Sequence, residues 1–140
     1  MEGRAAVSER AHQRDGRRRS IAVPGLSHLT AIPVATRIGP LVVSSVIAPF
    51  DPGTRDVPDT IDAQIANIFG HVGSMLDAAG ATWDDVAKMS FWVREPGHRA
   101  AIERSWLEHF PSAGSRPSRH THVTPDASMA SADFLAYVTG

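Results

Sequence analysis

Residues 61–80 have the sequence IDAQIANIFGHVGSMLDAAG, and this stretch decides the fold class. Its large apolar side chains recur every three or four residues, which predicts an α-helix with one buried face. Asp59 is placed to cap the start of this helix, and Gly80 can adopt the left-handed conformation that ends it. The apolar face consists of Ile61, Ile65, Ile68, Phe69, Val72, Met75 and Leu76.

Residues 86–94 predict a β-strand that follows this helix. The apolar residues Met89 and Phe91 alternate with Ser90 and Trp92. Because successive side chains of a strand point to opposite faces of the sheet, Ser90 and Trp92 are expected on the face away from the core. A monomer would leave that face exposed to water, so the pattern favours a closed oligomer in which other subunits cover it.

Shorter patterns predict the remaining elements. Residues 98–110 place Ile102, Trp106 and Phe110 four positions apart, which indicates a second helix. The resulting order, β-β-α-β-α-β-β, predicts an α+β domain in which two helices cover one face of a mixed sheet. The other strands are expected over residues 27–34, 38–46, 118–123 and 131–138.

Composition limits the classes of protein to which the chain can belong. The chain has 140 residues with 42% hydrophobic residues, which suits one globular domain. Its lack of cysteine excludes disulfides, thiolate nucleophiles and cysteine-ligated metals. No apolar run is long enough to span a membrane, and no secretory core follows Met1, so a cytoplasmic location is expected.

The net charge of −1 is unevenly distributed along the chain. Residues 1–20 hold six arginines and three acidic residues, a net charge of +3, whereas the rest holds 8 basic and 12 acidic residues. We therefore divide the chain into a flexible basic extension, residues 1–22, and a domain, residues 23–140. The acidic domain argues against binding of nucleic acid.

Four stretches of the chain resemble one known family. They are residues 38–45 (IGPLVVSS), the predicted first helix with Gln64 and Asn67, residues 84–93 (DDVAKMSFWV), and Phe110 followed by residues 116–119 (RPSR). Together they resemble the RidA/YjgF family of reactive-intermediate deaminases, over residues 28 to 138. The resemblance implies a chorismate-mutase-like α+β fold and a homotrimer with active sites between subunits.

The resemblance also implies a reaction. Members of the family hydrolyse reactive enamines and imines to 2-keto acids and ammonia, without a cofactor or metal. The matching arginine is Arg119, which would bind the substrate carboxylate, since a guanidinium forms two parallel hydrogen bonds to such a group. Thr121 shares the face of Arg119 and is expected to line the same cleft.

Other positions of the family's site are altered in this chain. Glu103 replaces the usual asparagine of the second helix, and Ser131 stands where the last strand normally carries glutamate, with Asp133 as the nearest acid. Val46 and Ile32 replace a glycine and a tyrosine. These changes imply a differently shaped cleft and a bulkier or more apolar substrate, with Glu103 as a candidate acid or base in place of the lost glutamate.

Two further groups complete the predicted substrate contacts. Ser45 is expected to offer hydrogen bonds to the ligand, and Trp92 is expected to reach the subunit interface.

His120 and His122 lie on one face of a strand, but two ligands are too few for a dedicated zinc site, so no metal is expected.

Alternatives to this assignment remain open from the sequence. Arg119 can instead be a structural arginine that pairs with an acid, and Glu103 an exposed helix carboxylate. The same scaffold can also carry a cyclisation or isomerisation of a small carboxylate, or a trimer that binds such a carboxylate without catalysis.

Overall fold

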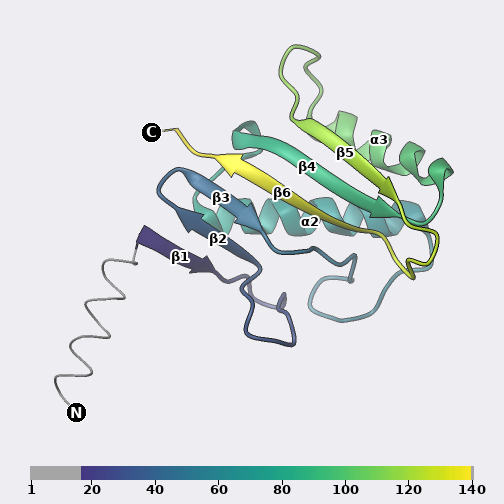
Figure 1. Cartoon of the computed structure of the whole chain (residues 1–140), viewed down its shortest axis with the longest axis horizontal. Coiled ribbons are helices and arrows are strands. Elements are labelled where there is room, and N and C mark those ends of the chain that lie inside the picture. The colour runs from purple at the N-terminus through teal and green to yellow at the C-terminus, as the bar shows by residue number, and fades with distance from the viewer. Residues whose placement is uncertain (1–16, 140) are drawn as a thin grey trace.

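The computed structural model of the chain describes residues 17–139, and its core is a six-stranded sheet covered on one face by two helices (Figure 1). The α+β class predicted from the sequence is confirmed. The elements are β1 (Arg18–Ile21), β2 (Ala35–Ile38), β3 (Leu41–Ser44), α2 (Ile61–Ala79), β4 (Val86–Val93), α3 (Arg99–His109), β5 (Ser118–Val123) and β6 (Ser131–Tyr137), with short 3₁₀ turns at Trp83–Asp85 and Pro96–His98.

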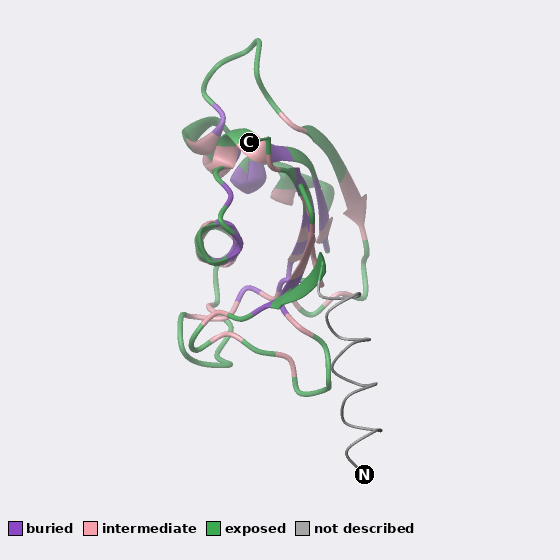
Figure 2. Ribbon diagram, turned by 90° about the vertical axis from the view of Figure 1, so that its left-hand side faces the viewer, coloured by how far each residue is buried: buried purple, intermediate pink, exposed green. Residues whose placement is uncertain are grey.

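Helix α2 forms the centre of the helical layer. Figure 2 shows it end-on, with its buried side turned toward the sheet. The predicted apolar stripe is buried except at Ile61, which is partly buried, and Gly80 ends the helix with a φ of 75°. The predicted cap was wrong by one residue: Thr60, not Asp59, caps the helix, because the Thr60 hydroxyl accepts a hydrogen bond from the Ala63 amide at 3.2 Å.

The strands are arranged in the order β1-β2-β3-β6-β4-β5. All neighbouring pairs are antiparallel except β4 and β5, which run parallel. A parallel pair needs a crossover connection, and α3 supplies it. Strand β5 therefore forms one edge of the sheet, and it lies on the same side of the molecule as α3 (Figure 1).

The two faces of the sheet differ in what covers them. Met89 and Phe91 of β4 are fully buried beneath the helices. Trp92, the residue after Phe91, points to the other face and is only partly buried. Within residues 17–139 no helix covers the second face (Figure 2). Leu135 and Tyr137 of β6 remain 38% and 53% exposed there, as the sequence pattern predicted for an open face.

The amino-terminal part of the domain differs from the prediction. Residues 18–21, assigned to the flexible extension 1–22, form strand β1, which pairs with β2 from Arg18 opposite Ile38 to Ile21 opposite Ala35. Burial of Ile21 holds this strand in place, while its arginines suit an exposed sheet edge. The rest of the assigned extension, residues 1–16, lies outside the described residues.

Residues 27–34 were predicted to form a strand, and this prediction was wrong. The segment is a loop, and β2 begins only at Ala35. Ser45 holds the loop, since its amide donates to the Val34 carbonyl at 3.0 Å and its hydroxyl donates to the Pro33 carbonyl at 2.7 Å.

Over residues 17–139, none of the helices combines the length and the apolar character needed to traverse a bilayer.

Candidate functional site

Arg119 lies near the start of edge strand β5 and faces helix α3. It is opposite Met89, whose side chain is buried under the helices. Its guanidinium carbon lies 4.8 Å from the centre of the Trp106 ring, and its Nη2 donates to Glu103 Oε2 at 2.9 Å. An aromatic face and a carboxylate therefore fix the position of the guanidinium.

Glu103 and Arg119 form an ion pair at the surface of the protomer. Their side chains are 49% and 28% exposed, so water screens the attraction and the pair is weak. The structure thus brings together the two residues predicted to be catalytic, although 16 positions separate them in the sequence. Any ligand carboxylate that binds Arg119 has to share the guanidinium with Glu103 or displace the Glu103 carboxylate from it.

Thr121 lies on the same face as Arg119. It is opposite Phe91 of β4, another residue buried under the helices, and its own side chain is half-buried. The alternation predicted for β5 is therefore correct. The face that β5 turns to α3 presents the guanidinium of Arg119 and the hydroxyl of Thr121, and α3 adds the carboxylate of Glu103.

Trp92 and Ser131 lie on the other face of the sheet. They are opposite each other in the β4–β6 pairing. Trp92 stacks on His122, with ring centres 4.8 Å apart and an angle of 7° between the rings. Within one protomer these two predicted substrate contacts therefore cannot meet a ligand held by Arg119.

Ser45, Val46 and Ile32 lie at a third place in the protomer. Ser45 and Val46 follow strand β3, which β6 and β4 separate from β5. The Ser45 amide and hydroxyl both donate to the loop before β2, so the predicted contact with a ligand would use the hydroxyl oxygen as an acceptor. Val46 and Ile32 are each about half exposed, at 54% and 51%.

Asp133 is the titratable group whose pKa the fold shifts most clearly. It lies opposite Ser90 on the open face of the sheet. Burial raises the pKa of this carboxyl above its ordinary value of 3.8, while the nearby charges of Lys88 and His122 act in the opposite direction. The sequence singled out Asp133 only as the acid nearest to Ser131.

The histidines of β5 share the open face with Asp133. The ring centres of His120 and His122 lie 3.9 Å apart. Among residues 17–139 no three histidine or acidic side chains come close enough together to hold a metal ion.

Comparison with solved structures identifies the class of protein that this fold defines. A conserved Rid-family protein of unknown function from Yersinia pestis superposes with a TM-score of 0.78 at 18% identity, over 86% of this chain and 99% of that one. RidA from a Psychrobacter species gives 0.75 at 18% identity, over 86% and 99%. The YjgF protein of E. coli gives 0.74 at 19% identity, over 85% and 98%. The chain therefore has the fold of the Rid proteins.

Sequence comparison then gives the family itself. The family described as Endoribonuclease L-PSP matches residues 30–129. A RutC family protein of Haemophilus influenzae is 30% identical over 76 residues, which are 54% of this chain and 58% of that protein, so the match spans less than two thirds of that relative. The chain belongs to the Endoribonuclease L-PSP family, the RidA/YjgF proteins, as its motifs predicted.

Proposed function

We propose that the protein hydrolyses a small carboxylated imine or enamine, releasing a keto acid and ammonia. The observation that carries this proposal is the guanidinium of Arg119, which α3 and β5 present at the edge of the sheet beside the carboxylate of Glu103. A fixed cation next to a carboxylate offers one group to bind an anionic substrate and another to move a proton.

Arg119 binds the substrate carboxylate. Glu103 engages one of the five N–H groups of the guanidinium, so the others can donate to a ligand. The stacking on Trp106 restricts the plane of the guanidinium, which reduces the freedom that Arg119 loses when the ligand binds.

Glu103 acts as the general base. It accepts a proton from a water molecule as the water oxygen bonds to the carbon of the C=N group, and it then passes this proton to the nitrogen. The C–N bond then breaks, so that imine and water become keto acid and ammonia. The exposed position of Glu103 lets water reach it.

A second protomer completes the cleft. The predicted contacts lie in three separate places of one protomer, and an adjacent copy in a homotrimer can bring Val46 and Ile32 of one subunit toward Arg119 of another. The exposed apolar groups Val46, Ile32, Leu135 and Tyr137 support such an association. Among residues 17–139 the Val46 amide has no hydrogen-bond partner, so it is available to stabilise charge developing on the substrate.

Three other functions compete with this proposal. A cyclisation or isomerisation of a small carboxylate would use the same two residues, and a non-catalytic trimer would use Arg119 alone. The family description also names an endoribonuclease. Beyond residue 20 the chain has 8 basic and 12 acidic residues, which weakens attraction to a phosphate backbone and favours the small carboxylate.

The test is the decay of imino acids. An amino-acid oxidase generates them, semicarbazide traps what remains, and the protein is compared with Arg119→Ala and with Arg99→Ala as the matched control. We expect the protein and Arg99→Ala to accelerate the loss of imine, and Arg119→Ala to lose the acceleration. Saturable binding of a keto acid without acceleration would support the carboxylate-binding trimer instead.

A further inference from the structure

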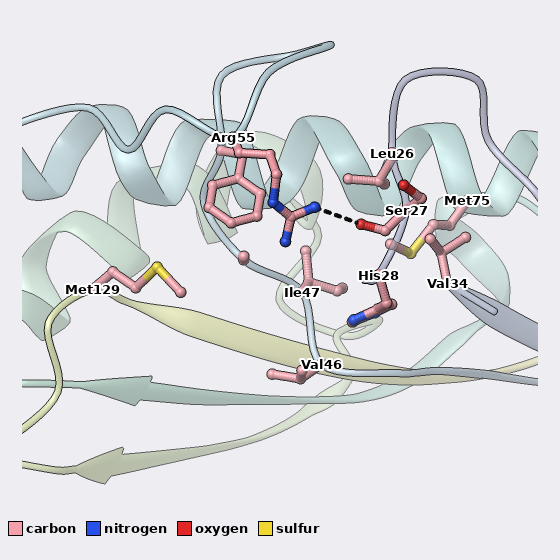
Figure 3. Close-up of a pocket in the computed structure, with 11 residues that line it drawn as sticks. Leu26, Ser27, His28, Val34, Val46, Ile47, Arg55, Met75 and Met129 are labelled. Atoms are coloured by element: carbon pink, nitrogen blue, oxygen red, sulfur yellow. Dashed lines mark hydrogen bonds between the residues drawn. The ribbon is translucent and has the colours of Figure 1, made fainter. Parts of the chain in front are cut away.

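A cavity of about 200 Å³ lies between α2, the loop before β2 and the loop after β3 (Figure 3). Most of its wall is aliphatic, aromatic or thioether, and methionines let such a wall adapt to the shape of a guest. The apolar wall residues are Leu26, Val34, Ile47, Phe50, Met75 and Met129.

Arg55 brings a positive charge to this apolar cavity. Its guanidinium carbon lies 4.8 Å from the centre of the Phe50 ring, and its Nη1 donates to the Ser27 carbonyl at 3.1 Å. Figure 3 shows the guanidinium and the ring of His28 directed into the cavity from different loops. Within residues 17–139 Arg55 forms no ion pair, so its remaining donors are available to an anion.

The shape and charge of the cavity define the class of ligand. A cavity of roughly 150 Å³ lined by aliphatic and aromatic residues accommodates benzene, so this one accommodates a guest of slightly greater size. Guanidinium groups bind carboxylates through paired hydrogen bonds. We propose that this cavity binds a small aliphatic monocarboxylate of about five or six carbons, with its carboxylate on Arg55 and its chain against Val34 and Met75.

Within one protomer this cavity is separate from Arg119 and Glu103. Arg119 belongs to β5 at one edge of the sheet, whereas the cavity lies beyond β3, on the far side of β4 and β6. The inference therefore does not depend on the reaction proposed above. Because Val46 lines the cavity and is also assigned to the proposed cleft, an experiment has to separate the two sites.

Calorimetric titration of the full chain with hexanoate, hexanol and acetate makes this separation. We expect hexanoate to bind at least tenfold more tightly than hexanol, which lacks the charge, and acetate, which lacks the chain. Arg55→Gln should weaken hexanoate binding at least tenfold, because a neutral amide cannot replace the charge and the paired hydrogen bonds that the guanidinium offers to a carboxylate. Arg119→Gln removes carboxylate binding at the proposed catalytic site, and hexanoate binding to the cavity should persist in this variant. Arg55→Lys should retain part of the binding to the cavity.

A second variant tests the cavity itself. Ala48 lines it and is partly exposed, so Ala48→Leu should fill part of the space and weaken hexanoate binding while the protein stays folded by circular dichroism. Equal binding of hexanol and hexanoate would overturn the proposal, as would no binding of hexanoate at millimolar concentration. Binding that is lost in Arg119→Gln but kept in Arg55→Gln would place the ligand in the cleft and also overturn it.

Discussion

Replacement of Glu103 by glutamine tests the proposed mechanism most directly. In the structure Glu103 Oε2 accepts a hydrogen bond from Arg119 Nη2 at 2.9 Å, in a pair whose side chains are 49% and 28% exposed. Pairs with this exposure contribute about 0.2–1 kcal/mol to stability. If the substrate carboxylate displaces Glu103 from the guanidinium, the wild-type protein loses that amount of binding energy.

The expected effect on binding follows from this range. At 1.4 kcal/mol for each tenfold change in affinity, loss of the pair in Glu103→Gln strengthens carboxylate binding by about 1.4- to 5-fold. The effect on the chemical step has the opposite sign, since removal of a general base costs about 10²–10⁴ in rate. We therefore expect KM to fall slightly and kcat to fall at least a hundredfold.

Initial rates of imino-acid hydrolysis over a range of substrate concentrations separate the two effects. Glu108→Gln is the matched control, because Glu108 lies on the same helix, is exposed, and forms no ion pair within residues 17–139. An unchanged kcat in Glu103→Gln would refute the role of Glu103 as base. A rise in KM would refute the idea that Glu103 competes with the substrate for Arg119.

Two further predictions concern the fold. Thr60→Ala should destabilise the protein by about 0.5–2 kcal/mol in urea unfolding, because the Thr60 hydroxyl caps α2, and Asp59→Ala should have the smaller effect; the reverse ranking would contradict the observed cap. Asp133→Asn should raise the unfolding midpoint at pH 7. Burial raises the pKa of Asp133 in the folded state, so the folded protein loses stability as the pH rises from 3.8 through that raised pKa. The neutral asparagine avoids this loss. Unfolding curves at pH 7 and at pH 3 test this, and an advantage of the variant that persists unchanged at pH 3 would contradict it.

The elements with strong periodicity were predictable from the sequence. The apolar stripe of α2 and the alternation in β4 each follow from burial of one face, and the structure confirms both. Strand β1 was not predictable, because Arg18 and Arg19 make it look like a solvated tail and only its pairing with β2 orders it. The loop before β2 contains apolar residues that suggest a strand, yet Leu29 and Ile32 are exposed in the protomer.

The candidate site was predictable only in part, for a similar reason. Alternation along β5 correctly placed Arg119 and Thr121 on one face, since that pattern depends on a single strand. Alternation along β4 likewise placed Trp92 on the open face of the sheet. Which face of β5 is turned to the helices depends on its pairing with β4, in which Arg119 lies opposite the buried Met89 and therefore on the face away from Trp92. Local sequence carries no information about such a pairing until the partner strand is known.

The contact between Arg119 and Glu103 bears on how the site can work. It forms within one protomer, so association with a neighbour is not needed to assemble the guanidinium and the carboxylate. In the proposed homotrimer, association would serve only to bring Val46 and Ile32 into reach. Oligomerisation would then determine which substrate fits, whereas the proposed cation and base already lie together within one protomer. A variant that dissociates the protomers would then lose affinity for an apolar substrate more than for a minimal imino acid, because only the apolar side chain requires the second subunit.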